Sequence, residues 1–172
     1  MSDLIPLLTK EEIDKAVSDI ARRISSDYKS CDLILIGVLK GAIIFLSDLI
    51  RKITIPVKVD FVRISSYGTE TSSSGNIHLS KDVEINLKDK DVLIIEDIVD
   101  TGLSLTYLSN HLKSFGPKSV KICSLIDKHE RRKADIKIDY VGRVIKEGFL
   151  VGYGLDYAEK FRNLPGVYQL KT

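Results

Sequence analysis

The sequence of 172 residues has only two cysteines, Cys31 and Cys123, and each lies next to or inside an apolar segment. Cysteines in such positions are expected to be reduced, buried thiols rather than members of a disulfide or a metal site. The three histidines, His78, His111 and His129, are scattered and show no metal-ligand spacing. The sequence therefore argues against a disulfide scaffold and against a histidine-bound metal centre.

Long apolar segments and long runs of one charge are also missing. No segment approaches the length needed to cross a bilayer, and the N-terminus lacks the apolar core of a signal peptide. The net charge is only +2, and the basic cluster at residues 131–133 is short. We therefore expect a cytoplasmic protein that binds neither membranes nor nucleic acid. The length and the 44% of hydrophobic residues suit a single domain over residues 1–172.

The most informative segment begins with the apolar residues 92–95. Their β-branched side chains predict a strand buried on both faces, as in a parallel sheet. Glu96, Asp97 and Asp100 follow where this strand should end, which is the edge where open α/β sheets bind ligands. Any one of these acids could simply end a strand, and Asp100 could cap a helix. The three together favour a functional site.

A turn of hydroxyl residues and glycine, residues 101–104, follows these acids and leads into a helical pattern. Such a turn offers the free N–H groups and the partial positive charge of a helix N-terminus, which bind phosphate. Carboxylates would repel that phosphate unless they bind ribose hydroxyls or a divalent cation, so the pattern predicts a phosphorylated sugar with Mg²⁺. A Walker-B strand is excluded, because the sequence lacks the motif G-x-x-x-x-G-K-[ST].

The remaining pattern predicts an α/β protein in which strands and helices alternate. Thr9 and Glu12 indicate a capping box ahead of an amphipathic helix. Residues 65–75 lack periodicity and predict a loop, below which residues 77–79 and 83–85 are expected to pair as a β-arm. Further elements are predicted as strands at 32–38, from 57, at 120–126 and within 136–145, and as helices at 42–50 and 105–115.

Residues 94–102 (Ile-Ile-Glu-Asp-Ile-Val-Asp-Thr-Gly) resemble the phosphoribosyl-pyrophosphate signature of the type I phosphoribosyltransferases, and most closely that of the hypoxanthine-guanine members. The resemblance runs in order through four motifs and covers nearly the whole chain. It implies the fold of that family: a central, mostly parallel sheet flanked by helices, a small hood formed by parts of the N- and C-terminal segments, and a flexible active-site loop. It also implies a homodimer or a homotetramer.

The resemblance implies how the chain would hold phosphoribosyl pyrophosphate (PRPP). Glu96, Asp97 and Asp100 would contact the ribose, the first two would also help to place Mg²⁺, and Asp100 would act as general base on the purine. The residues implied in binding the 5′-phosphate are Thr101, Gly102, Leu103, Ser104 and Thr106. Those implied in binding the pyrophosphate are Lys40, Gly41 and Arg162.

The resemblance also implies a purine site. Lys128 would donate a hydrogen bond to the 6-oxo group, although a lysine at a strand end is often only a surface charge. Phe149 would stack on the base, although an isolated Phe most often packs in the hydrophobic core. The backbone of Leu150 would read the edge of the base, and Asp156 would approach the base or a second metal ion. Related bacterial sequences often have proline after the lysine, and His129 replaces it here.

Ser66, Tyr67 and Gly68 resemble the start of the mobile loop that closes over the active site in this family, although an inert surface loop would have a similar composition. The implied reaction is purine salvage: transfer of the 5-phosphoribosyl group from PRPP to N9 of hypoxanthine, guanine or both, which yields IMP or GMP and pyrophosphate. Two alternatives remain, a nucleotide-sensing regulator on the same fold and a transferase for another base such as xanthine. Lys128 argues against adenine, whose 6-amino group is a donor.

Overall fold

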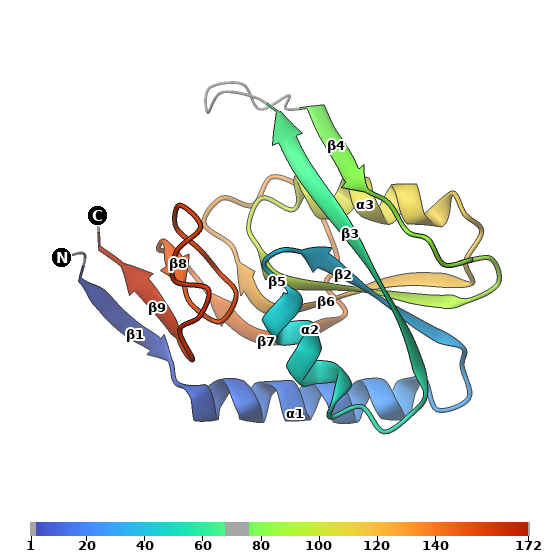
Figure 1. Ribbon diagram of the computed structural model, residues 1–172, viewed down its shortest axis with the longest axis horizontal. Helices are drawn as coiled ribbons and strands as arrows, with labels where there is room; N and C mark the ends of the chain where they lie inside the picture. Colours follow the sequence, from blue (N-terminus) through green and yellow to red (C-terminus); the bar gives the residue numbers. More distant parts are fainter. Residues whose placement is uncertain (1–2, 68–75, 172) are drawn as a thin grey trace.

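A computed structural model describes residues 3–67 and 76–171 of the chain (Figure 1). In chain order its elements are β1 (Leu4–Leu8), α1 (Lys10–Asp27), β2 (Leu33–Leu39), α2 (Ile43–Ile50), β3 (Val57–Tyr67), β4 (Asn76–Lys81), β5 (Asp91–Val99), α3 (Leu103–Lys113), β6 (Ser119–Lys128), β7 (Tyr140–Ile145), β8 (Leu150–Val151) and β9 (Val167–Leu170). The predicted strands and helices are present, with ends shifted by a few residues, except for the strand expected at residues 83–85. The predicted α/β class is confirmed.

The main sheet has the strand order β4-β3-β2-β5-β6-β7, in which β4 alone is antiparallel to its neighbour. The order reverses between β2 and β5, because β3 lies beyond β2 whereas β6 and β7 lie beyond β5. In open α/β sheets, ligands bind in the crevice at the carboxyl ends of such a strand pair. The turns after Leu39 and Val99, where β2 and β5 end, flank this crevice.

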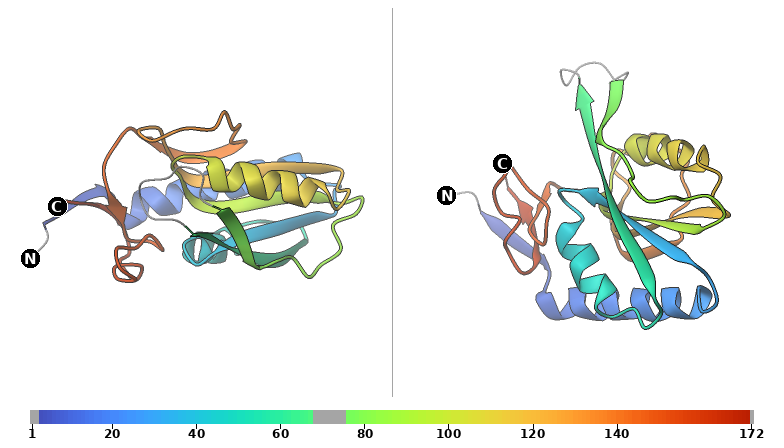
Figure 2. Two further views of the ribbon diagram at one scale, coloured as in Figure 1. Left: turned by 90° about the horizontal axis from the view of Figure 1, so that it is seen from above. Right: turned by 45° about the vertical axis from the view of Figure 1, so that its right-hand side comes forward.

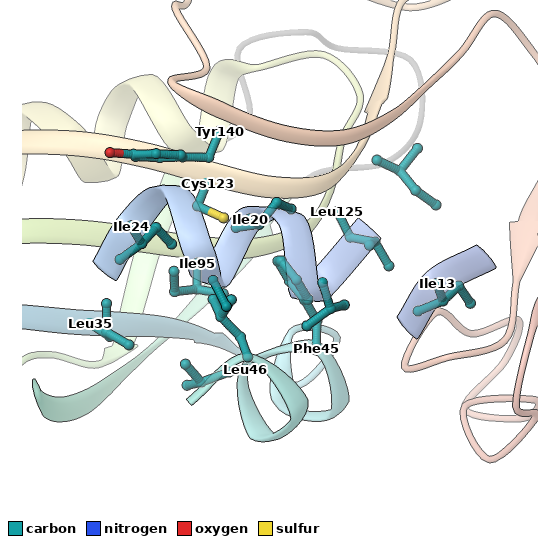
Figure 3. Packing of buried hydrophobic residues seen from close by; sticks show 14 of the residues in the cluster. Ile13, Ile20, Ile24, Leu35, Phe45, Leu46, Ile95, Cys123, Leu125 and Tyr140 are labelled. Atoms are coloured by element: carbon teal, nitrogen blue, oxygen red, sulfur yellow. The ribbon is translucent and has the colours of Figure 1, made fainter. Parts of the chain in front are cut away.

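Helices cover both faces of the sheet, with α1 and α2 on one face and α3 on the other (Figures 1 and 2). Along β2, Leu33 and Leu35 pack into the core with α1 and α2, whereas Ile34 and Ile36 pack into the core with α3. This explains the unbroken apolar run, because successive side chains point to opposite faces and both faces are buried. Figure 3 shows the first core, where Phe45 of α2 meets side chains of α1 and of the sheet.

The capping box at the start of α1 is confirmed. The Glu12 N–H donates to Thr9 Oγ1 at 3.1 Å, and the Thr9 N–H donates to Glu12 Oε2 at 2.9 Å. The buried face of the helix consists of Ile13, Val17, Ile20, Ala21 and Ile24. Helix α1 is thus fixed at its first turn and along its apolar stripe. Among the helices of the described residues, none is both long and apolar enough to cross a membrane.

A second, antiparallel sheet, β1-β9-β8, joins the two ends of the chain (Figure 1). Leu4 pairs with Leu170, and Leu150 pairs with Gln169. This pairing anchors the segment that follows β8. At Gly154 a Cβ would lie only 2.2 Å from the Gly41 carbonyl oxygen, so this segment packs directly on the turn after β2. The small sheet therefore carries C-terminal residues to the edge of the crevice.

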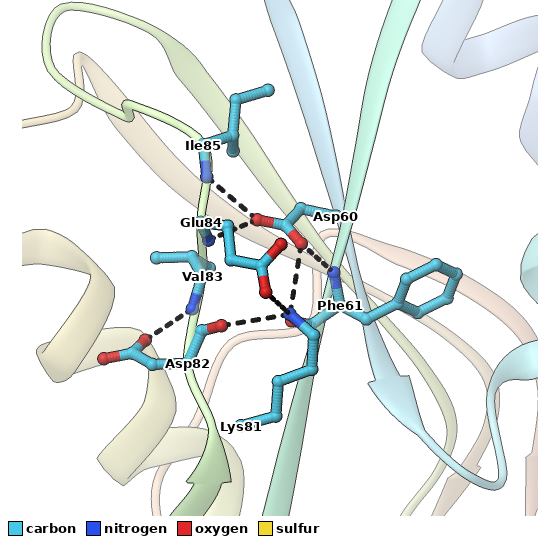
Figure 4. Close-up of polar contacts among 7 residues, drawn as sticks. All are labelled: Asp60, Phe61, Lys81, Asp82, Val83, Glu84 and Ile85. Carbon is cyan, nitrogen blue, oxygen red and sulfur yellow. Dashed lines mark hydrogen bonds and ion pairs between the residues drawn. The ribbon is translucent and has the colours of Figure 1, made fainter.

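The expected pairing of residues 77–79 with 83–85 is wrong. Strand β4 pairs with β3 instead, with Ser65 opposite His78. Residues 83–85 form no strand. The Asp60 carboxylate explains this, because its Oδ2 accepts the N–H groups of Glu84 at 2.7 Å and Ile85 at 3.1 Å (Figure 4). A side chain thus takes the donors that a neighbouring strand would have used.

The cysteines are both unpaired, but only one of them is buried. Cys123 lies in β6 and is fully buried, which raises its pKa, whereas Cys31 is exposed. Cys31 precedes β2 in the turn after α1, and its N–H donates to the Tyr28 carbonyl. The expectation of a buried thiol was therefore wrong for Cys31, because the strand begins two residues later than the thiol.

Asp60 should be important for stability. Its side chain is nearly buried, and burial opposes its charge, but N–H groups of Glu84, Phe61 and Ile85, together with the Lys81 ammonium, hold its pKa below the usual range. Asp60→Asn would place an amide N–H group against one of these donors. We expect it to lower the free energy of unfolding by about 2–3 kcal/mol at pH 7, measured by urea denaturation.

The effect of Asp60→Asn on the free energy of unfolding should depend on pH. A carboxyl whose pKa is lower in the folded state stabilises the fold above its unfolded pKa, and this stabilisation is lost as the pH falls through the folded pKa. The difference between wild type and Asp60→Asn should therefore shrink below about pH 4. The exposed Asp135→Asn variant serves as the control and should show no such trend. A difference that stays constant down to pH 3 would contradict the role of the ionised carboxylate.

Candidate active site

A cavity of about 250 Å³ lies where the predicted site residues meet. Its lining residues are Asp97, Ile98, Asp100, Lys128, Arg131, Phe149, Leu150, Leu155 and Asp156. They come from the ends of β5 and β6, from the turns that follow, and from the C-terminal segment around β8. The fold thus brings together residues from three distant parts of the sequence at the crevice beside the strand reversal.

Glu96 and Asp97 are two adjacent carboxyl groups at the end of β5. Burial raises the pKa of Glu96, and the Asp97 carboxylate raises it further. Burial also raises the pKa of Asp97, although hydrogen bonds, including one from the Ile98 N–H at 2.8 Å, offset part of this effect. Burial thus disfavours the charge of both carboxyl groups, and Asp97 adds to this effect at Glu96. A divalent cation or sugar hydroxyl groups would stabilise this arrangement.

The third predicted metal ligand, Asp156, is not part of a three-ligand cluster with these acids. Its Oδ1 pairs with Arg162 NH2 at 3.0 Å, and its Oδ2 accepts the Glu159 N–H at 2.8 Å. Within residues 3–67 and 76–171, no group of three or more acids, histidines or cysteines could hold a metal ion. Glu96 and Asp97 could therefore contribute only part of a cation's coordination shell, with a substrate and water supplying the rest.

The turn after β2 fits tightly against Asp97. A Cβ at Gly41 would lie 2.1 Å from Asp97 Oδ2, so a side chain here would require the turn or the acid to move. The peptide bond between Leu39 and Lys40 is cis. Gly154 packs on the other side of this turn and has a φ of +98°, which favours glycine. The Lys40-Gly41 turn is thus held between β5 and the C-terminal segment.

The predicted phosphate turn leads into α3 as expected. Gly102, with a φ of +81°, is the N-cap residue of the helix, so the alternative in which Asp100 caps it is wrong. The Thr106 hydroxyl donates to the Gly102 carbonyl at 2.8 Å, and the Leu103 N–H donates to Thr101 Oγ1 at 3.3 Å. Ser104 lies within the first turn of α3. The turn therefore places hydroxyl groups and a helix N-terminus beside the β5 acids.

Asp100 and Lys128 face each other across the cavity. The Lys128 side chain is only 8% exposed, and its Nζ lies 3.6 Å from Asp100 Oδ2 and 3.3 Å from Glu130 Oε2. Asp100 Oδ1 is buried and has no hydrogen-bond partner among the described residues. Buried polar atoms are nearly always paired in proteins, so this oxygen marks a place where a ligand could donate a proton or hydrogen bond.

Arg132 holds the ends of β5 and β6 together, a function that the sequence did not reveal. Its Nε donates to the Asp100 carbonyl at 2.9 Å, and its NH2 donates to the carbonyls of Val99 at 3.3 Å and Lys128 at 3.1 Å. The same group pairs with the Asp127 carboxylate. One guanidinium thus fixes the backbone of both residues that face each other in the cavity.

Replacing Arg132 should destabilise the protein more than replacing its neighbour. Arg132→Met removes the donors of several partly buried acceptors, and we expect the free energy of unfolding to fall by about 2–4 kcal/mol. The side chain of Arg131 is 67% exposed. Arg131→Met, the matched control, should therefore change this free energy by less than about 0.5 kcal/mol. Equal effects of both variants in urea denaturation would contradict the bracing role of Arg132.

Lys40 and Arg162 lie on opposite sides of one acid, Glu159. Glu159 Oε2 is 2.7 Å from Lys40 Nζ, and Glu159 Oε1 is 3.2 Å from Arg162 NH2. Arg162 NH1 also donates to the Gly154 carbonyl at 2.7 Å. The two charged residues among the predicted pyrophosphate ligands are therefore close together, and they are linked by an acid that the sequence pattern did not single out. The position of Glu159 three residues before Arg162 could have indicated an ion pair between the two side chains.

The predicted purine-stacking residue is open to a ligand. Phe149 is 46% exposed, and its ring meets Tyr157 edge to face, with centroids 5.5 Å apart. Leu150 follows in β8 and is buried. Of the predicted lid residues, Ser66 and Tyr67 end β3, whereas Gly68 lies outside the described residues. The lid therefore stays a prediction.

Comparisons with known proteins identify the family of the chain. A sequence model of the family described as "Phosphoribosyl transferase domain" matches residues 7–158. The chain therefore belongs to the phosphoribosyltransferase family, as the resemblance predicted.

Within that family, the chain is similar to proteins named hypoxanthine-guanine or hypoxanthine phosphoribosyltransferase. The hypoxanthine-guanine phosphoribosyltransferase of Bacillus subtilis is 47% identical, over 96% of this chain and 92% of its own. The enzyme of the same name from Mycobacterium tuberculosis is 43% identical, over 95% of this chain and 87% of its own. A crystal structure of the hypoxanthine phosphoribosyltransferase of Staphylococcus aureus matches with a TM-score of 0.93 and 43% identity, covering 96% of this chain and 90% of that one.

Proposed function

We propose that this chain is a purine-salvage enzyme that transfers the 5-phosphoribosyl group of PRPP to N9 of hypoxanthine or guanine. The observation that carries the proposal is the cavity in which the buried Lys128 ammonium faces Asp100, whose Oδ1 has no partner among the described residues. A 6-oxopurine needs a donor for its oxygen and an acceptor for the proton that it loses. This pair offers both.

The proposed reaction forms a bond between purine N9 and C1 of the ribose and breaks the bond between C1 and the pyrophosphate oxygen. Asp100 takes the N7 proton of the purine as N9 attacks. Lys128 binds the 6-oxo group, the exposed face of Phe149 stacks on the base, and the backbone of Leu150 reads its edge. The products are IMP or GMP and pyrophosphate.

The donor is held by groups at the carboxyl ends of the neighbouring strands. Glu96 and Asp97 bind the ribose hydroxyls, and the turn of residues 101–106 binds the 5′-phosphate through N–H and hydroxyl groups. Lys40 and Arg162 neutralise the leaving pyrophosphate, while Gly41 lets the turn approach it. Ser66, Tyr67 and Gly68 keep their predicted role as the start of a lid that excludes water, although Gly68 lies outside the described residues.

Mg²⁺ belongs to this proposal, and the residues present fit it. The raised pKa values of Glu96 and Asp97 have their cause in burial and crowding, which a bound cation would relieve. Mg²⁺ is commonly held by one or two carboxylates together with substrate phosphates, so a three-acid cluster is not required. When bound, the ion supplies charge that stabilises the departing pyrophosphate. Asp156 is already paired with Arg162, so it would have to leave that partner to bind the ion.

The cellular setting and the assembly are also proposals. We infer a cytoplasmic enzyme formed by one domain, with the sheet β1-β9-β8 as its hood, that assembles as a homodimer or homotetramer. Exposed apolar residues on α2, Ile43 at 46% and Ile44 at 38%, support assembly. Light scattering coupled to size-exclusion chromatography would determine the number of subunits.

The function is tested by incubating the purified protein with PRPP, Mg²⁺ and hypoxanthine, guanine, xanthine or adenine in turn. We expect nucleoside monophosphate from hypoxanthine or guanine and none from adenine, because Lys128 requires an acceptor at the 6-position. A preference for xanthine would move the substrate assignment to that base. No product from any base, in a folded protein that still binds PRPP, would overturn the proposal.

A further inference from the structure

Glu159 forms ion pairs with Lys40 and Arg162, the two cationic side chains that the proposed function assigns to pyrophosphate. Its Oε2 lies 2.7 Å from Lys40 Nζ, and its Oε1 lies 3.2 Å from Arg162 NH2. Lys40 follows β2, whereas Arg162 belongs to the C-terminal segment. The carboxylate is therefore a bridge across the edge of the site, and each of its two oxygens has one cation.

The backbone around Glu159 presents this side chain in a defined way. The Glu159 N–H donates to Asp156 Oδ2 at 2.8 Å, and Tyr157 and Lys160 exchange backbone hydrogen bonds of 3.1 and 3.0 Å around the turn. Ala158 and Glu159 have positive φ values of 50° and 64°. The turn is thus closed on itself, and it directs the Glu159 carboxylate toward the two cations. The side chain is still 64% exposed, so a ligand can reach it.

We propose that Glu159 is a built-in competitor of the pyrophosphate group, an inference that rests on the proposed roles of Lys40 and Arg162. The carboxylate holds both cations in the unliganded protein and leaves them when a diphosphate arrives. Carboxylate and phosphate oxygens bind ammonium and guanidinium groups in the same way, so one can replace the other. The carboxylate and the diphosphate repel each other, which prevents both from binding the same cations at once.

This exchange has a consequence for turnover. While the site is empty, Glu159 keeps Lys40 and Arg162 paired and close together, which limits how far either side chain can move away. When pyrophosphate has formed, the carboxylate competes for the same two cations and so favours release of the product. Product release limits the rate of many enzymes, so a competitor at the leaving-group site affects the whole cycle.

The test is an isothermal titration calorimetry experiment in which inorganic pyrophosphate is added to the protein in the presence of Mg²⁺. Glu159→Gln keeps the size of the side chain and removes its charge. Because exposed ion pairs are individually weak, we expect this variant to bind pyrophosphate about three- to tenfold more tightly than the wild type. Glu11→Gln, an exposed residue of α1, makes the same change in net charge and should leave the affinity unchanged.

The outcomes separate this inference from the proposed function. Unchanged or weaker pyrophosphate binding by Glu159→Gln, in a protein whose wild type makes nucleotide from PRPP, would overturn the role of Glu159 alone. Tightening of equal size in Glu11→Gln would also overturn it, because net charge would then be the cause. A wild type that neither binds pyrophosphate nor uses PRPP would overturn both inferences.

Discussion

Asp100→Asn should lower kcat by at least about 100-fold, because general base catalysis typically contributes a factor of 10²–10⁴. The amide has the size of the carboxylate but cannot take a proton from the purine. It would also place either a neutral oxygen or an N–H group at the position of Oδ1, the buried atom without a partner among the described residues. The prediction therefore concerns the chemical step, and steady-state kinetics with saturating substrates would measure it.

PRPP binding separates a chemical role of Asp100 from a structural one. The 5′-phosphate and the pyrophosphate are assigned to other groups, so the affinity for PRPP should change by less than about threefold, which corresponds to under 1 kcal/mol. Asp135→Asn, at an exposed position, provides the matched control and should keep full activity. If Asp100→Asn retained a near-normal kcat, another group would have to be the base.

The acids of β5 could be located from sequence because their signal is local. An unbroken apolar run fixes a strand buried on both faces, and the residues that follow it must lie at the carboxyl edge of the sheet. Glu96, Asp97 and Asp100 lie there in the structure. The capping box of Thr9 and Glu12 was equally readable, since both of its hydrogen bonds join residues three positions apart.

Contacts between distant segments could not be read in the same way. Arg132 belongs to a basic cluster that looks like solvated surface, and its four acceptors become visible only when β5 and β6 lie side by side. Asp60 is an acid in an alternating strand, and nothing local indicates that it captures the N–H groups of residues 84 and 85. For this reason the β-arm was assigned to the wrong partner.

The resemblance named Lys40 and Arg162, yet it did not name the acid that joins them. The resemblance points to residues that are expected to contact substrates, whereas Glu159 contacts two of those residues, Lys40 and Arg162. Asp156, in contrast, is a residue that the resemblance did name. It was expected near a metal ion or the base, but in the structure its Oδ1 is paired with Arg162. The structure therefore shows contacts among Asp156, Glu159 and Arg162 that the sequence motif alone did not predict.

Lys128→Met should weaken hypoxanthine binding by about 10- to 100-fold, since a hydrogen bond from a charged donor contributes about 1.5–3 kcal/mol. The methionine fills the space of the lysine stem without donating to the 6-oxo group. The affinity for PRPP should stay within about threefold of the wild-type value, because Lys128 is not among the residues proposed to bind PRPP. Hypoxanthine KM, PRPP KM and kcat together distinguish these effects.

A second effect of Lys128→Met tests whether the lysine also acts on Asp100. The variant removes the ammonium group 3.6 Å from Asp100 Oδ2 and 3.3 Å from Glu130 Oε2, which leaves two neighbouring acids without that cation. Discrimination between hypoxanthine and adenine should fall, because the 6-amino group of adenine no longer opposes a donor. Lys118→Met, at an exposed position, should leave this ratio intact. If Lys128→Met kept both the wild-type hypoxanthine KM and the wild-type ratio, the buried ammonium would serve only to neutralise Asp100 and Glu130, and base recognition would have to come from the backbone around Leu150.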